Sequence, residues 1–305
     1  MQQVYRHFNR GLIQFDPDCA RYDSGLAYTL KPGTCTFENL EFRTTVHVNR
    51  MGTRDDDAAL EAPEVIVLGD SYVMGWGVEQ DETLARALAR KSGLKVLNAG
   101  ESSYCTAREM LLLDRLDTSR MTTLIVQYAD NDLPENRSMR EHQGVLPIMP
   151  ETEYQNIVRH YAAQRSYYPG KYIYRSFMKL SRLEEPEPDQ LRMDPIAPAD
   201  EAELFLYVLS HGTRAPLDHV QVIVFEINEQ IRPPRPFIAA LDEVRRRAGN
   251  PAFVQRLTAL DVAPLLNRDD FYVLDDHMRA RGHQVVGEAL ADLVVRARTR
   301  QPDLR

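Results

Sequence analysis

One serine in this chain is placed as a nucleophile would be. Ser71 follows the apolar run 65–68 and the pair Gly69-Asp70. Such a run is typical of a buried strand in a parallel sheet, and open α/β sheets bind ligands at the carboxyl ends of their strands. Gly69 allows a tight turn, after which Ser71 can expose its hydroxyl and aim its own N–H at an oxyanion. The alternative is an ordinary turn with Asp70 or Ser71 as a helix cap.

A histidine with acidic neighbours lies near the C-terminal end. His277 follows Asp275 and Asp276, and a serine nucleophile needs an imidazole base whose tautomer is fixed by a carboxylate. His219 also follows an aspartate, but it precedes a predicted strand instead of following one. We therefore expect His277 to be the base, the alternative being an exposed histidine in an acidic, helix-capping loop.

A third polar group follows another predicted strand, at 123–128. The amide of Asn131 is placed there to donate to a developing oxyanion, although asparagine is also a common turn former. The three groups follow different strands of one predicted sheet, and this favours a shared site at its edge.

The elements needed to position these groups are readable from the hydrophobic pattern. Short apolar runs alternate with segments of helical periodicity, which indicates an α/β fold with a central parallel sheet between two helical layers. Residues 1–60 form a small β-rich N-terminal extension with a strand over 42–48, and 61–305 form the main domain, with a cap inserted at about 133–200. The predicted strands are 65–68, 95–98, 123–128, 220–226 and 271–274, and the predicted helices are 81–92, 106–116, 200–211, 237–248 and 282–298.

Composition excludes several classes of function. The 305 residues carry a net charge of −8, which argues against nucleic acid as a partner because phosphate binding needs clustered Lys and Arg. No apolar run is long enough to span a membrane. The first ten residues lack the apolar stretch of a signal peptide, so we expect a cytoplasmic protein, or an extracytoplasmic one if a signal or anchor has been removed.

The three cysteines do not form a metal or redox motif. Cys19, Cys35 and Cys105 are too far apart for a C-x-x-C pair, and no phosphate-binding loop appears, so no cofactor is expected. Cys19 and Cys35 would bridge in an oxidising compartment, but with no signal peptide we expect free thiols. Cys105 is expected to be a small structural residue beside the site.

The motifs together resemble the SGNH, or GDSL-type, hydrolase superfamily. Gly69-Asp70-Ser71 is similar to its first block, Asn131-Asp132 to its third, and Asp275-Asp276-His277 to its last. The resemblance implies a flavodoxin-like α/β/α fold and ester chemistry. It also implies that Ser71 is the nucleophile and that Asp275, separated from His277 by one residue, orients the base. Asp276 is then a turn residue.

The second block departs from the family pattern. The family has a glycine whose N–H is an oxyanion donor, whereas here Ser103 stands at that position and Gly100 lies three residues earlier. Serine keeps its backbone N–H, so we expect Ser71, Ser103 and Asn131 to supply the donors, with Gly100 as the fallback for Ser103.

The resemblance implies a serine esterase. We expect small acyl groups, first of all acetyl on carbohydrate, because the polar stretch 133–160 does not suggest an entrance for a lipid chain. An O-acyltransferase and a non-catalytic binding protein on the same fold are the alternatives. Trp76 is expected either to stack on a sugar or to pack internally, and Tyr72, beside the nucleophile, is a weaker substrate contact.

Overall fold

The computed structural model describes residues 12–165, 196–228 and 236–300. Its centre is a five-stranded sheet in the order β6-β5-β7-β8-β9, in which every neighbouring pair is parallel. This is the flavodoxin-like order, so the fold class predicted from the sequence is confirmed. The strands are β5 (Val65–Leu68), β6 (Val96–Asn98), β7 (Thr123–Tyr128), β8 (Gln221–Glu226) and β9 (Thr258–Leu260).

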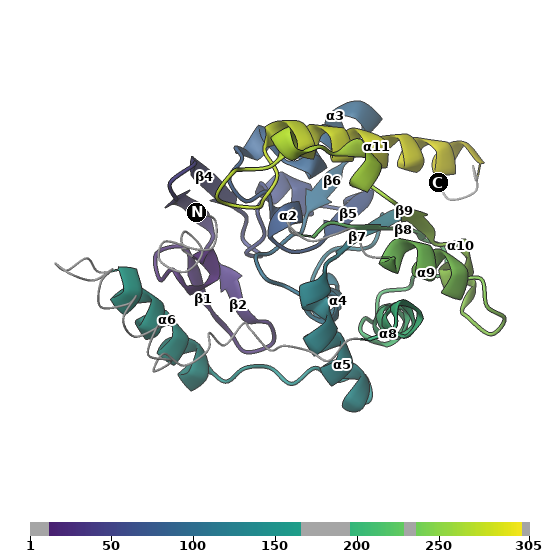
Figure 1. The fold of residues 1–305 in the computed structure, drawn as a ribbon, viewed down its shortest axis with the longest axis horizontal. Coiled ribbons are helices and arrows are strands. Elements are labelled where there is room, and N and C mark those ends of the chain that lie inside the picture. The colour runs from purple at the N-terminus through teal and green to yellow at the C-terminus, as the bar shows by residue number, and fades with distance from the viewer. Residues whose placement is uncertain (1–11, 166–195, 229–235, 301–305) are drawn as a thin grey trace.

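Helices cover both faces of this sheet, with α3 and α11 above it and α4, α5, α8 and α9 below it in Figure 1. Alternate strand residues face the two layers: Val65 and Val67 pack in one cluster with residues of α3 and α11, and Ile66 and Leu68 in another with residues of α4, α8 and α9. Both faces are therefore buried, which explains why the strands are continuously apolar. The helices are α2 (Ser71–Met74), α3 (Leu84–Ser92), α4 (Thr106–Leu113), α5 (Leu133–Glu141), α6 (Glu151–Arg165), α8 (Pro198–His211), α9 (Phe237–Val244), α10 (Ala252–Arg256) and α11 (Ala280–Arg300).

The last strand predicted from the sequence is wrong. Residues 271–274 form a loop that is held by one isolated bridge, from Phe271 to Met278. The fifth strand is instead β9, a three-residue edge strand of half-buried residues. The apolar run was misleading because the N–H groups of Val273 and Leu274 donate to a side-chain carboxylate, that of Glu41, and join no ladder.

Two antiparallel strand pairs precede the main sheet. The first is β1 (Ala20–Asp23) with β2 (Ala27–Leu30), and the second is β3 (Gly33–Glu38) with β4 (Arg43–Val48). The predicted strand 42–48 therefore corresponds to β4. Helix α6 lies beside the first pair (Figure 1), and the Tyr154 hydroxyl on it donates to the Gln14 carbonyl at 2.9 Å. Residues 166–195 of the expected cap lie outside the described residues.

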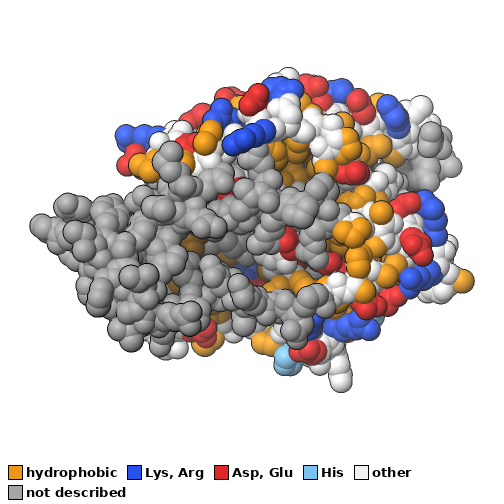
Figure 2. Space-filling view, in the orientation of Figure 1, with side chains coloured by type: hydrophobic (Ala, Val, Ile, Leu, Met, Phe, Trp, Pro, Cys, Tyr) orange, Lys and Arg blue, Asp and Glu red, His pale blue; other side chains and the backbone are white. Residues whose placement is uncertain are grey.

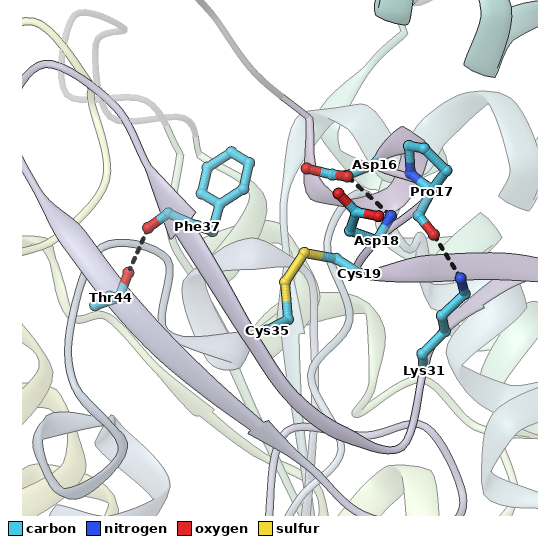
Figure 3. Close-up of a disulfide and its surroundings, with 8 residues drawn as sticks. All are labelled: Asp16, Pro17, Asp18, Cys19, Lys31, Cys35, Phe37 and Thr44. Carbon is cyan, nitrogen blue, oxygen red and sulfur yellow. Dashed lines mark hydrogen bonds between the residues drawn. A yellow bond between two sulfur atoms is a disulfide. The ribbon is translucent and has the colours of Figure 1, made fainter.

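A disulfide joins Cys19, just before β1, to Cys35 in β3 (Figure 3). The expectation of free thiols is therefore wrong for this pair, whereas Cys105 is free and buried. The sequence did not reveal the pairing because it depends on how the two hairpins lie against each other, which brings the Cα atoms to 5.4 Å. A crosslink over a loop of this length stabilises the fold by about 3 kcal/mol, chiefly by restricting the unfolded chain.

The surface shown in Figure 2 mixes charges of both signs. Along the edge formed by α3 and α11, Lys and Arg side chains lie among Asp and Glu, and Lys91 of α3 pairs with Asp292 of α11 at 2.7 Å. In the ranges that the structure describes, no helix combines the length and the apolar character needed to cross a membrane. Short 3₁₀ helices link the elements: Ile13–Phe15, Asp57–Leu60, Gln80–Glu82, Asp130–Asp132, Ala263–Leu265 and Arg268–Asp270.

Candidate active site

Ser71 follows strand β5 and is the first residue of the short helix α2. The carboxylate of Asp70 caps this helix by accepting the Tyr72 N–H at 2.8 Å. A side chain on Gly69 would place its Cβ 2.3 Å from Val73 Cγ2, so only glycine lets the strand turn so closely into the helix. As the sequence indicated, the turn leaves Ser71 partly exposed at the carboxyl edge of the sheet.

The structure brings Ser71, His277 and Asp275 into direct contact. Ser71 Oγ lies 2.7 Å from His277 Nε2, and His277 Nδ1 lies 2.5 Å from Asp275 Oδ1. With its proton on Nδ1, the imidazole donates to the carboxylate and leaves Nε2 to accept the serine hydroxyl proton. Two residues separated by 206 positions in the chain thus meet as a nucleophile and base must.

The carboxylate of Asp275 is held in its ionised form. Burial by itself raises the pKa of Asp275, but the charge of His277 and hydrogen bonds from His277 and Trp76 outweigh it and lower that pKa to about 2. Its second oxygen, Oδ2, accepts from Trp76 Nε1 at 3.1 Å and from Asn39 Nδ2 at 2.9 Å. Oδ1 also accepts the backbone N–H of His277 at 3.2 Å, so each oxygen accepts two hydrogen bonds, and the negative charge is available to stabilise an imidazolium.

Trp76 and Tyr72 enclose the imidazole instead of facing solvent. Their rings lie 5.3 Å and 4.8 Å from that of His277, and both side chains are buried. The stacking of Trp76 on a sugar and the weaker substrate contact of Tyr72 stay predictions. In the structure the Trp76 indole holds Asp275, and the Tyr72 hydroxyl donates to the Asp276 carbonyl at 3.3 Å. For Trp76, internal packing was the other alternative considered from the sequence.

Trp76→Phe is expected to reduce kcat by about tenfold while leaving KM nearly unchanged. The change keeps an aromatic ring between Phe37 and the imidazole but removes one hydrogen bond to a buried charge, an interaction typically worth about 1.5–3 kcal/mol. Steady-state kinetics with p-nitrophenyl acetate measures both constants. A change confined to KM would mean that Trp76 contacts substrate instead.

Ser103 adopts the left-handed conformation that normally favours glycine. Its φ is 59°. This conformation costs a non-glycine residue about 1–3 kcal/mol. The cost explains why the SGNH/GDSL-type proteins have a glycine at this position. Buried Gln14 holds the loop, donating to Ser103 Oγ at 2.9 Å and accepting from Ser102 Oγ at 3.0 Å. Within the described ranges, the N–H groups of Ser71 and Ser103 have no acceptor, so both can serve an oxyanion.

Gly100, the fallback donor, has a different role. Its N–H donates to Asn98 Oδ1 at 3.1 Å, so it is not free for an oxyanion. A Cβ at this position would lie 2.3 Å from the Met74 nitrogen. Gly100 is required because the chain after β6 passes against the backbone of the nucleophile helix.

Asn131 lies exposed in the short helix that follows β7. Buried Cys105 donates through Sγ to the Asn131 carbonyl at 3.1 Å, and burial raises the pKa of this thiol well above its usual value. The loop after β6 also binds the nucleophile turn, since Glu101 N–H donates to the Gly69 carbonyl at 2.9 Å. The loops after β5, β6 and β7 thus adjoin one another, with Ser103 and Asn131 on the two that flank the nucleophile.

Several residues of this site had no recognisable signal in the sequence. Gln14, Asn39 and Glu41 precede the first motif and reach the site only through the fold. Fully buried Arg54 donates to the carbonyls of Met74 and Gly75 and, at 2.6 Å, of Val78, fixing the chain after the nucleophile helix. Only the folded topology brings these side chains to the site.

Among the residues that the structure describes, one group of side chains has a spacing suited to a metal ion. The ligand atoms of Asp275, Asp276 and His277 lie within 4.8 Å of one another. However, both ring nitrogens of His277 already have hydrogen-bond partners, namely Ser71 and Asp275. This arrangement suits transfer of a proton between serine and imidazole.

A serine bonded to a histidine that is held by an aspartate, at the carboxyl edge of a parallel sheet, is the arrangement of a serine hydrolase site. No family model and no curated protein matches this sequence. Among solved structures, the fold is similar to those of a lipolytic G-D-S-L family member from Veillonella parvula DSM 2008, a lipase from a goat rumen metagenome, and a salicylyl-acyltransferase of a tetracycline biosynthetic pathway.

These likenesses are distant. The Veillonella protein is 12% identical, with a TM-score of 0.34 over 77% of this chain and 98% of the other. The rumen lipase is 13% identical, with a TM-score of 0.35 over 75% of this chain and 95% of the lipase. The acyltransferase is 14% identical, with a TM-score of 0.40 over 77% of this chain but only 56% of the acyltransferase. The chain resembles the SGNH/GDSL-type proteins, and the case for its chemistry rests on its own site.

Proposed function

We propose that this protein is a serine esterase that hydrolyses small acyl esters, acetyl esters of carbohydrates first among them. The observation that carries the proposal is the continuous hydrogen-bonded series from Ser71 Oγ through His277 to Asp275, at 2.7 and 2.5 Å. A chance contact would not also place an ionised carboxylate on the far nitrogen of the ring.

The reaction proceeds through an acyl-enzyme. Ser71 Oγ attacks the ester carbonyl carbon while its proton passes to His277 Nε2, and the N–H groups of Ser71 and Ser103, with the Asn131 amide, receive the oxyanion. Collapse of this intermediate breaks the bond to the alcohol, which leaves with the proton from His277. Water then attacks the acyl-enzyme with His277 again as base, releasing the acid and restoring Ser71.

The polar segment after Asn131 supports a small acyl group. Helix α5 buries only Leu133, Asn136 and Met139, and its other side chains are mostly charged. A long acyl chain requires a continuous apolar channel, whereas an acetyl group needs only space beside Ser71. A carbohydrate alcohol fits polar surroundings because its hydroxyls require hydrogen-bond partners.

The proposal is tested with p-nitrophenyl acetate, butyrate and octanoate, together with a peracetylated monosaccharide. We expect kcat/KM to be highest for the acetate and to fall with chain length, with acetate released from the sugar. A preference for octanoate would overturn the small-acyl assignment. If product analysis instead showed acetyl transfer to an added oligosaccharide, with little hydrolysis, the same acyl-enzyme would be serving an O-acyltransferase.

A further inference from the structure

The segment that carries Asp275 is a loop and belongs to no strand or helix itself. It joins the isolated bridge residue Phe271 to the start of α11, and three of its successive N–H groups converge on one carboxylate. Glu41, in the turn between β3 and β4, accepts from Val273 at 2.8 Å and from Leu274 and Asp275 at 2.7 Å each. Converging backbone N–H groups form an anion-binding nest, and bonds to a charged acceptor are the stronger kind.

The same turn also contacts the side chain of Asp275. Asn39 donates from Nδ2 to Asp275 Oδ2 at 2.9 Å. The orientation of the Asn39 amide is set by its oxygen, which accepts the N–H groups of Glu41 at 2.8 Å and Phe42 at 3.2 Å. Asn39 therefore shapes the turn with one atom and faces the candidate catalytic acid with the other.

This turn is anchored independently of the loop it holds. Cys35, four residues before Asn39, is crosslinked to Cys19, and Phe42 packs edge-on against Trp76, outside that loop, with ring centroids 6.2 Å apart. A fixed support of this kind can set the position of Asp275, whereas a mobile one would only follow it.

We propose that Asn39 and Glu41 are positioning residues for the Ser71–His277–Asp275 site, so that the N-terminal strand pairs are part of the catalytic unit. This inference rests on the function proposed above. Glu41 fixes the backbone of the acid loop, and Asn39 fixes the rotamer of the acid by binding the oxygen that does not face His277. Both residues bind the acid loop, so we expect their loss to lower turnover and to leave substrate binding nearly unchanged.

The test uses the full chain with Asn39→Asp and Glu41→Gln. Asn39→Asp keeps the oxygen that shapes the turn but replaces the donor with an oxygen facing Asp275. Glu41→Gln removes the charge and at least one of the three bonds. Glu38→Gln is the matched control, because Glu38 lies on the same hairpin but is exposed and pairs only loosely, at 3.6 Å, with Arg43.

With p-nitrophenyl acetate, we expect both site variants to lose about tenfold or more in kcat, with KM and melting temperature close to wild type. The control should match the wild type. If both variants retain kcat within about twofold of wild type, the inference is wrong. If Glu41→Gln fails to fold, Asn39→Asp alone decides. An inactive wild-type protein would instead refute the proposed function itself.

Discussion

Replacing Ser71 by alanine is expected to reduce hydrolysis of p-nitrophenyl acetate by about 10⁴-fold or more, the scale seen when a serine nucleophile is removed. The change deletes the atom that forms the acyl-enzyme and leaves only the binding and oxyanion groups. The fold should be unaffected, because the hydroxyl bonds to His277 alone among the described residues and Asp70 still caps the helix.

The measurement is kcat/KM for the variant, with its melting temperature recorded beside it. Ser138→Ala is a suitable control, since this serine lies on α5 with no hydrogen bond from its side chain to the described residues, and it should behave as wild type. Activity of Ser71→Ala near the wild-type level would mean that another residue is the nucleophile.

Asp275→Asn is expected to reduce kcat by about 10⁴-fold, because it selects the wrong tautomer of the base. The N–H donors of Trp76 and Asn39 face Oδ2, so the new amide will place its oxygen there and its NH₂ toward His277. The imidazole must then accept at Nδ1 and carry its proton on Nε2. In that form it cannot accept a proton from Ser71.

Asp276→Asn provides the matched comparison for the identity of the acid. This side chain is buried beside the same histidine, but it is Asp275 that bonds to the ring at 2.5 Å. We expect Asp276→Asn to lose less than about tenfold in kcat. A larger loss from Asp276→Asn than from Asp275→Asn would exchange the roles of the two aspartates.

The central sheet could be predicted because most of its strands are short, continuous apolar runs in the sequence. Runs such as Val65–Leu68 are short and continuously apolar, as expected of strands buried on both faces. The edge strand β9 could not be predicted, since three half-buried residues carry no such signal. The apolar run at 271–274 was misread because its N–H groups are bound by Glu41, more than two hundred positions earlier.

The candidate site likewise has residues that local motifs predicted and residues that only the fold brings there. Ser71, Asp275 and His277 each lie in a local motif that directly follows or precedes an element, and the structure brings them into contact. Asn39 and Glu41 act through contacts between distant segments, which no local pattern encodes. Trp76 was recognised as notable, but its indole N–H could be assigned to Asp275 only once the fold was known.

The most direct test of the account is covalent labelling with a fluorophosphonate. The reagent forms a bond from its phosphorus to an activated serine oxygen and loses fluoride, so it reports whether a hydroxyl is deprotonated by a neighbouring base. We predict a single adduct on the intact protein, located at Ser71 by peptide mapping and absent from Ser71→Ala. Lack of an adduct, or one at any other residue, would contradict the central claim that Ser71 and His277 form a working nucleophile and base.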